Sequence, residues 1–397
     1  MNPSSLPPAL ASRTAAIEPF HVMELVKRAN ALERAGRSII HMSIGEPDFT
    51  APPPVLAALE RVAHGGGTQY TAAVGIEPLR RAIARHYADD FGVEVDPARI
   101  IVTAGASAAL TLACCALVNP GDRVLLADPS YPCNRHFVAA FDGEPVLVPV
   151  GAGTRFQLDA ALVEARWGAR VRGTLLATPA NPTGTAIPFD ELGRILDVVR
   201  ARRGFAIVDE IYLGLSYDGR PRTVLELGDD MVVTNSFSKF FHMTGWRLGW
   251  LVVPPTLVPA FEKLAQNLFI CASTLAQKAA LACFEPESMA IYRARRDEFR
   301  DRRDWLVPAL RELGFDVPVT PDGAFYVWAD CSRFTDDSDR FAIELLEQAG
   351  VAVVPGMDFG VNDPKRWLRL SYATHLDNLR EAVRRLGAHL GRPAAGG

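Results

Sequence analysis

Lys239 stands among side chains that could together bind a phosphate group. It follows an apolar run that is typical of a buried strand, where a lysine is costly to bury unless it has a chemical task. Ser236 and Ser238 flank it with hydroxyl groups, and Arg247 follows eight residues later. A phosphate dianion needs a fixed positive charge and several hydrogen-bond donors. Alone, Lys239 would be explained as a strand-end lysine reaching solvent, but its neighbours favour a reactive amine beside a phosphate site.

A helix N-terminus that could complete such a site precedes this segment in the chain. Gly105, Ala106 and Ser107 lie between a predicted strand and a predicted helix. Their small side chains would let backbone N–H groups approach an anion closely. Many strand-to-helix turns look alike, so this glycine turn is weak support on its own.

Further polar side chains follow other predicted strands. Asp209 ends an apolar strand, where ligand contacts are expected in open α/β sheets, and Tyr212 follows three residues later. The Asp209 carboxylate could be a helix cap or an ion-pair partner, or it could keep the nitrogen of a bound pyridine ring protonated. Asn181 stands in an Asn-Pro-Thr-Gly turn, and Arg369 on a later short strand could bind a carboxylate with its planar guanidinium. Each of them, taken alone, has an ordinary structural explanation.

These side chains need a sheet whose strands end side by side. From about residue 99, short apolar strands alternate with helices, which indicates a largely parallel sheet covered on both faces. Residues 19–35 and 286–313 have helical patterns, and the rest of the C-terminal part is typical of a smaller α+β domain. The predicted fold class is therefore α/β, with a large domain and a small one.

Composition and charge narrow the class of function. The chain has 397 residues, 22% of them charged, and a formal net charge of −4, which favours neither nucleic acid nor a membrane surface as a partner. Its six cysteines have no metal or redox spacing, and we expect no metal site. No G-x-G-x-x-G lies between a strand and a helix, which disfavours a nucleotide-dependent dehydrogenase. The N-terminus lacks the pattern of a secretory signal and no apolar stretch is long enough to span a bilayer, so we expect a cytoplasmic location.

Taken together, the motifs resemble those of the class I/II aminotransferases, which are pyridoxal-phosphate enzymes of fold type I. The resemblance covers roughly residues 17–385 and is closest to a subgroup with the motif Ile-Gly-Glu-Pro-Asp-Phe, here residues 44–49. It implies an N-terminal arm and helix over residues 1–50 that join the small domain. A large cofactor-binding domain over residues 51–289 and a C-terminal small domain over residues 290–397 would follow.

The resemblance also assigns roles around pyridoxal 5′-phosphate. Lys239 would carry the cofactor as a Schiff base and then move the reacting proton, and Asp209 would pair with the pyridine nitrogen. Tyr131 would stack on the ring, while Asn181 and Tyr212 would hydrogen-bond its phenolic oxygen. The phosphate would be held by Gly105, Ala106, Ser107, Ser236, Ser238 and Arg247.

On the substrate side, the resemblance implies a carboxylate site and a partner subunit. Arg369 would bind the substrate α-carboxylate, helped by Asn181 and the Gly45 backbone. Tyr70 would reach the phosphate of a partner subunit, so the expected active unit is a homodimer with shared sites.

Two features bear on the choice of substrate. Aspartate-preferring relatives often have a lysine where this chain has Ser107, which puts aspartate specificity in doubt. Ile17, Phe20 and Met23 resemble the N-terminal segment that closes over the substrate, and they would make it apolar. A neutral or aromatic amino acid is therefore expected, although core packing explains these three side chains about equally well.

The implied reaction is a ping-pong transfer of the α-amino group of an L-amino acid to a 2-oxo acid, with pyruvate or 2-oxoglutarate as the acceptor. A β-eliminating C–S lyase on the same scaffold would use the same residues, and the sequence discriminates poorly between the two. A non-catalytic regulatory module of a transcription factor is a distant alternative, because too few residues precede the fold to form a DNA-binding unit.

Overall fold

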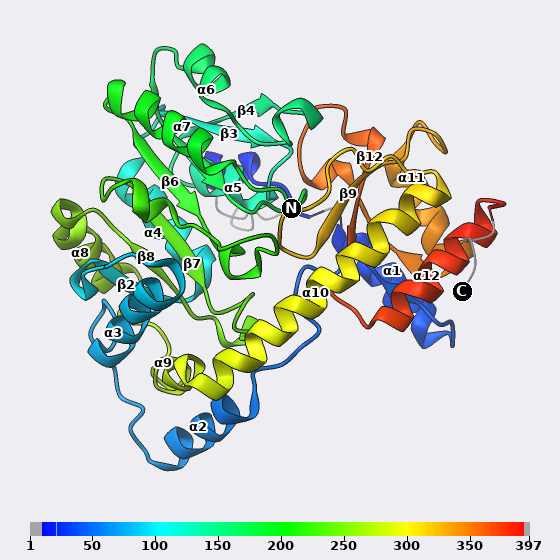
Figure 1. Cartoon of the computed structure of the whole chain (residues 1–397). Helices are drawn as coiled ribbons and strands as arrows, with labels where there is room; N and C mark the ends of the chain where they lie inside the picture. Colours follow the sequence, from blue (N-terminus) through cyan, green and yellow to red (C-terminus); the bar gives the residue numbers. More distant parts are fainter. Residues whose placement is uncertain (1–9, 21, 393–397) are drawn as a thin grey trace, which may run out of the picture.

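A seven-stranded sheet forms the centre of the computed structural model, which describes residues 10–20 and 22–392 (Figure 1). Six of its strands point the same way, and β8 is antiparallel to both of its neighbours, β7 and β2. Its strands, in spatial order, are β2 (Ile100–Thr103), β8 (Gly249–Val252), β7 (Val232–Ser236), β6 (Phe205–Asp209), β5 (Val171–Ala177), β3 (Arg123–Asp128) and β4 (Glu144–Pro149). The predicted largely parallel sheet is confirmed.

An apolar core covers each face of this sheet, because successive side chains along a strand point to opposite faces. Ile101, Ile207 and Leu251 belong to the core that includes α4, whereas Ile100 and Val208 belong to the core on the other side. Strands buried on both faces are apolar throughout, which is the pattern seen in the sequence. The edge strand β4 was not among the predicted strands, since it contains two prolines and is only half-buried.

Helices lie before, between and after these strands. They are α2 (Pro53–His64), α3 (Glu77–His86), α4 (Gly105–Leu117), α5 (Pro132–Ala139), α6 (Ala160–Arg166), α7 (Phe189–Ala201), α8 (Val258–Leu268) and α9 (Thr274–Ala279). Of these, α3, α4, α5 and α7 contact the large sheet, α6 and α8 pack on α7 and α4, respectively, and α2 packs on α9. None of the helices in residues 10–20 and 22–392 is both long and apolar enough to cross a membrane.

A smaller region lies beside the large sheet, on the right of Figure 1. We call it the small-sheet region; it consists of β9 (Tyr326–Asp330), β11 (Val354–Pro355), β12 (Trp367–Ser371), α11 (Ser338–Glu344) and α12 (Leu376–His389). The three strands form an antiparallel sheet in the order β11-β12-β9. The N-terminal helix α1 (Val22–Arg34) joins this region, and β1 (Ile40–His41) pairs in parallel with β10 (Val351–Ala352).

The helix α10 (Pro286–Leu313) links the two regions as one 28-residue element, as expected for residues 286–313. It contacts α2 near one end and α12 toward the other (Figure 1). The expected domain boundary between residues 289 and 290 falls inside this helix, and the division of the chain into domains stays a prediction. Of the expected N-terminal arm, residues 1–9 lie outside the described residues, while Ser12–Ala16 form a short 3-10 helix.

Candidate active site

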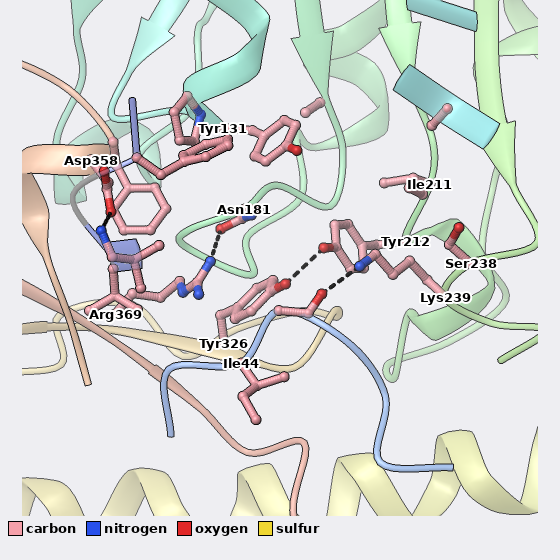
Figure 2. A pocket seen from close by; sticks show the side chains of 18 of the residues that line it. Ile44, Tyr131, Asn181, Ile211, Tyr212, Ser238, Lys239, Tyr326, Asp358 and Arg369 are labelled. Carbon is pink, nitrogen blue, oxygen red and sulfur yellow. Dashed lines mark hydrogen bonds between the residues drawn. The ribbon is translucent and has the colours of Figure 1, made fainter. Parts of the chain in front are cut away.

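A cavity of about 440 Å³ opens between the carboxyl ends of the parallel strands and the small-sheet region (Figure 2). It brings together most of the side chains that the sequence singled out. Those that line it are Phe20, Met23, Gly45, Ala106, Ser107, Tyr131, Asn181, Asp209, Tyr212, Ser238, Lys239, Arg247 and Arg369. Parallel strands end at one edge of a sheet, so residues that follow different strands meet there. Asp209 ends β6, Lys239 follows β7, and Asn181 follows β5.

Lys239 is half-buried at the centre of the cavity. Its Nζ donates a hydrogen bond to the backbone oxygen of Gly45 (Figure 2). Loss of water around the amine lowers the pKa of Lys239 to about 8, and the positive charges of Arg369 and Arg247 act in the same direction. A lysine with a lowered pKa has more of the neutral, nucleophilic amine near neutral pH, as covalent catalysis at a carbonyl group requires.

Asp209 is a buried carboxylate directed by two neighbours. It is 5% exposed, and its Oδ1 accepts hydrogen bonds from the Thr234 hydroxyl at 2.9 Å and from the Ile211 N–H at 3.1 Å. Burial raises the pKa of Asp209 to about 6, because no water stabilises the charge. A protonated ring nitrogen placed against this carboxylate would supply the missing positive charge.

The residues expected to hold a phosphate form a cup at the start of α4. The Ser236 hydroxyl donates to Ser238 Oγ at 3.0 Å, and Arg247 Nη1 lies 3.4 Å from the same Oγ. Gly105 begins α4 with φ of +82°, and a Cβ there would lie 2.6 Å from Arg247 Nη2. A side chain at residue 105 would therefore close the cup. Backbone N–H groups, hydroxyls and a guanidinium converge here on a space with the chemistry of an anion site.

Arg369 is the centre of a second polar group on the opposite side of the cavity (Figure 2). It is 6% exposed; its Nη1 donates to Asn181 Oδ1 at 2.9 Å and its Nη2 to the Ser43 oxygen at 2.8 Å. Its Cζ lies 4.4 Å from the centre of the Tyr326 ring. The Tyr326 hydroxyl is in turn 2.9 Å from that of Tyr212. The buried Nε of Arg369 has no partner within the described residues, so the guanidinium keeps capacity for a carboxylate ligand.

These groups fit the cofactor that the sequence motifs imply. An amine with a lowered pKa suits an aldehyde, a buried carboxylate suits a ring nitrogen, and the cup at α4 suits a phosphate. Arg369 remains for a carboxylate beyond the ring. The fit rests on the kinds of donor and acceptor present and on the space between them.

Four expected site residues are not among those that line the cavity: Gly105 and Ser236, which belong to the phosphate cup behind its surface, and Ile17 and Tyr70. The side chain of Ile17 is 41% exposed and lies outside it, whereas Phe20, three residues later, is part of its wall. The segment around Ile17 and Phe20 has no regular helix or strand, so its sequence has no periodicity that would show which side chains face the cavity. Tyr70 is 82% exposed, as a residue that reaches a neighbouring subunit would be in a single chain.

The sequence did not point to several other residues of the cavity. Tyr326 lies in an aromatic and apolar strand, where it looks like core. Asp358 lines the cavity and accepts a hydrogen bond from the Val22 N–H at 2.8 Å, which ties the start of α1 to the small-sheet region. Thr234 points from β7 toward Asp209. These contacts join segments far apart in the chain, so local patterns carry no signal for them.

The wall opposite the strand ends is largely apolar. Phe20, Met23 and Val26 contribute from the N-terminal segment and α1, Ile44 contributes from the loop after β1, and Leu110 of α4 adds a further apolar side chain to the lining. The N-terminal segment and the start of α1 therefore supply apolar side chains to this part of the cavity, and their closing over a substrate stays a prediction.

Comparison with known proteins agrees with this geometry. The family model "Aminotransferase class I and II" matches residues 37–386. The chain is 40% identical over 378 residues to a valine–pyruvate aminotransferase of Mycobacterium tuberculosis, with 95% of this chain and 97% of the relative covered.

Solved structures give the same result. A crystal structure of an aminotransferase from Mycobacterium tuberculosis matches with a TM-score of 0.93 and 40% identity, over 97% of this chain and 100% of that chain. An aspartate aminotransferase from Thermus thermophilus with maleate matches with a TM-score of 0.90 and 33% identity, over 96% and 99%.

Proposed function

The chain belongs to the aminotransferase class I and II family, and we propose that one of its substrates is an L-amino acid with a neutral or aromatic side chain. It is a pyridoxal-phosphate-dependent aminotransferase that moves an amino group to a 2-oxo acid. The related C–S lyase and regulatory roles are not favoured by these relatives. The subgroup defined by residues 44–49 stays a prediction.

In the reaction, each polar group has one task. The bound cofactor supplies an electron sink for the charge that develops at the substrate Cα. Lys239 Nζ would hold the cofactor and, once free, would take the proton from the substrate Cα. The Asp209 carboxylate would keep the ring nitrogen protonated, and Arg369 would orient the substrate by its α-carboxylate. Asn181 and Tyr212 would supply hydrogen bonds to the phenolic oxygen.

The observation that carries the substrate proposal is the small number of cations around the cavity. Among the described residues that line it, the cationic side chains are Lys239, Arg247 and Arg369. The cofactor aldehyde, its phosphate and the substrate α-carboxylate account for these three. A distal carboxylate would meet Phe20 and Met23 instead, and burial of an unpaired charge against apolar atoms is costly. The relative named for valine and pyruvate has a substrate of the proposed kind.

A donor and acceptor screen tests this proposal. We expect kcat/KM for L-valine or L-phenylalanine, with pyruvate or 2-oxoglutarate as acceptor, to exceed that for L-aspartate by at least about tenfold, since one buried unpaired charge costs ~1.4 kcal/mol or more. Preference for L-aspartate would contradict the proposal. Release of ammonia and pyruvate from cystathionine without an acceptor would instead favour the lyase.

We also propose that the enzyme works as a homodimer in a reducing, cytoplasmic compartment. Arg247 and Ser107 are exposed at the phosphate end of the cavity, so this end needs a cover from outside the chain. Tyr70 is exposed on a segment that packs against Thr274, whose hydroxyl donates to the Gln69 oxygen at 2.7 Å. A second copy that brings Tyr70 to the phosphate would provide this cover. All six cysteines are free.

Complementation between two inactive variants tests the shared site. In a mixture of Lys239→Ala and Tyr70→Ala chains, a mixed dimer has one site with both Lys239 and Tyr70. We expect the mixture, after exchange of subunits, to be more active than either variant alone. Sedimentation should give twice the mass of the chain, and a monomer with full activity would contradict the proposal.

A further inference from the structure

The turn that carries Asn181 (residues 178–187, the Asn181 turn) is held against the loop between α10 and β9 (residues 321–323, the clamp loop). Two backbone N–H groups of the clamp loop donate to the carbonyl oxygen of Gly184, at 2.9 and 3.0 Å. Gly184 has φ of +67°, and a Cβ there would lie 2.9 Å from a clamp-loop carbonyl oxygen. The two backbones therefore approach so closely that only glycine fits between them.

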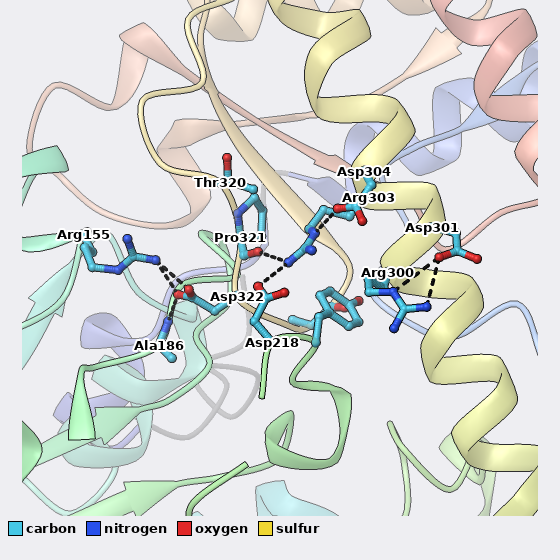
Figure 3. A network of polar contacts seen from close by, with 12 residues as sticks. Arg155, Ala186, Asp218, Arg300, Asp301, Arg303, Asp304, Thr320, Pro321 and Asp322 are labelled. Carbon is cyan, nitrogen blue, oxygen red and sulfur yellow. Dashed lines mark hydrogen bonds and ion pairs between the residues drawn. The ribbon is translucent and has the colours of Figure 1, made fainter. Parts of the chain in front are cut away.

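Asp322 supplies the one polar side chain of the clamp loop (Figure 3). Its Oδ2 accepts a hydrogen bond from the Ala186 N–H at 2.7 Å, at the end of the Asn181 turn. Arg155 Nη2 donates to both carboxylate oxygens, at 2.6 and 2.7 Å. The carboxylate thus joins three segments that lie far apart in the sequence. Charge-assisted hydrogen bonds of this kind are about twice as strong as neutral ones.

The segment around Arg155 is itself bent to reach both partners. Arg155 and Phe156 each have φ of +57°, a left-handed conformation that side-chain-bearing residues rarely adopt. Phe156 is 3% exposed and packs edge-on against Trp367, with ring centres 5.2 Å apart. The Gln157 amide donates to the Thr185 oxygen at 2.6 Å. Residues 155–157 therefore hold the clamp loop with one side chain and the Asn181 turn with another.

The consequence of this arrangement reaches the carboxylate site. Asn181 Oδ1 accepts the hydrogen bond from Arg369 Nη1, so a shift of the turn moves one of the partners that orient Arg369. Asp322 precedes Tyr326 by four residues, and the Tyr326 ring lies 4.4 Å from Arg369 Cζ. The clamp loop is therefore connected to both neighbours of the Arg369 guanidinium: the Asn181 amide and the Tyr326 ring.

We propose that Asp322 is a positioning residue for substrate binding, which acts by fixing the Asn181 turn, with Arg155 holding its carboxylate in place. The proposal rests on the role proposed above for Asn181 and Arg369. It assigns to the Arg155–Asp322 pair a function in holding the amino acid, at a distance from the reacting atoms and without contact to them.

Asp218 offers a matched control in the same network (Figure 3). Its carboxylate accepts a hydrogen bond from Arg303 Nη1 at 3.0 Å, and Arg303 also donates to the Pro321 oxygen at 2.8 Å. Asp218→Ala thus removes a carboxylate from the same surface without removing an acceptor from the Asn181 turn. Asp322→Ala removes the acceptor and the ion pair together.

The test compares steady-state constants and the cofactor spectrum of the loaded enzyme. For Asp322→Ala we expect KM for the amino donor to rise about tenfold while kcat falls less than about threefold, as for loss of one charge-assisted hydrogen bond. The pH midpoint of the cofactor's visible absorbance should also shift, because Asn181 would hydrogen-bond the phenolic oxygen in the proposed role. Asp322→Asn should lie between Asp322→Ala and wild type, since its amide oxygen still accepts from Ala186. Asp218→Ala should stay within about twofold of wild type.

Two outcomes would overturn the proposal. One is an Asp322→Ala enzyme whose KM and absorbance midpoint equal those of Asp218→Ala, even if its melting temperature is lower. The other concerns Asn181→Ala, measured beside it. If Asn181→Ala raises KM and Asp322→Ala does not, the positioning role of Asp322 is wrong while the role of Asn181 stands. If Asn181→Ala leaves KM unchanged, the role proposed for Asn181 is wrong, and the positioning role of Asp322 is wrong with it.

Discussion

The two walls of the active-site cavity are built in different ways. The strand-end wall takes Asp209, Asn181 and Lys239 from the ends of three neighbouring parallel strands or the segments that follow them, and each strand can be recognised in the sequence. The facing wall takes Arg369 from β12, Tyr326 from β9 and the rest from the N-terminal segment, which meet only in the folded chain. We propose that the strand-end wall carries the chemistry and that the facing wall, which is assembled from segments far apart in the chain, recognises the substrate.

This difference predicts two kinds of variant. Substitutions of Lys239 or Asp209 in the strand-end wall should stop the reaction, because they remove groups that act on the reacting atoms. Asn181 bonds Arg369, so its substitution should also weaken substrate binding. Substitutions in the facing wall should change which substrate binds and how tightly, while the chemical step continues.

Lys239→Ala should have the largest effect. Without the amine that holds the cofactor and moves the proton, turnover should fall by at least about 10³-fold. Pyridoxal phosphate should still bind through its phosphate, which cofactor fluorescence after gel filtration measures. Lys263→Ala, on the exposed side of α8, is the control. Full activity of the Lys239 variant would remove the basis for calling the strand-end wall chemical.

The pH dependence of cofactor attachment should come next in size. Because the pKa of Lys239 is lowered to about 8, its amine is mostly neutral above this pH and protonated below it. The rate of attachment to cofactor-free protein should therefore rise about tenfold per pH unit up to about pH 8 and then level. Stopped-flow absorbance between pH 6 and 10 checks this, with an N-acetyl-lysine amide as the reference. A rise that continues to the ordinary value of 10.5 would mean that the amine is not desolvated.

Arg369→Ala should separate the two walls most clearly. Loss of charged hydrogen bonds of ~2 kcal/mol predicts a rise in KM for the amino donor of about 30-fold, with a much smaller fall in kcat. Arg369→Lys keeps the positive charge but not the planar guanidinium, so its KM should lie between those of wild type and Arg369→Ala. Equal falls in kcat and kcat/KM, with KM unchanged, would place Arg369 with the chemical wall.

Tyr326→Phe should give the smallest of these effects. It removes only the hydroxyl that lies 2.9 Å from the Tyr212 hydroxyl, so a loss of ~1 kcal/mol, or about fivefold in kcat/KM, is expected. The same substitution at Tyr372, whose hydroxyl donates to Tyr217 at 3.4 Å in the core, is the control. A larger effect at Tyr372 would show that Tyr326 matters for packing alone.

The two walls also differ in how well they can be predicted from the sequence. The strands that end in Asp209 and Ser236 are apolar runs with polar ends, so both the strands and the ligand positions beside them were predictable. β4 was not, because two prolines in a half-buried edge strand hide its pattern. On the facing wall, Arg369 was singled out as a planar cation on a short strand and given its role by the resemblance, while Tyr326 and Asp358 were missed because the contacts that give them a role cross many residues. The pair of Arg155 and Asp322, 167 residues apart, is of the same kind.

The length of α10 has a consequence for insertions and deletions. Tyr292 packs on Phe241, with ring centres 5.3 Å apart, beside the loop of Lys239, and Arg303 bonds the clamp loop. Each residue of an α-helix adds a rotation of about 100° and a rise of about 1.5 Å. One residue more or fewer between positions 292 and 303 would turn one contact away from its partner by more than a quarter turn. The number of residues in α10 therefore fixes the relative direction of these two contacts, even where its exposed side chains can be exchanged.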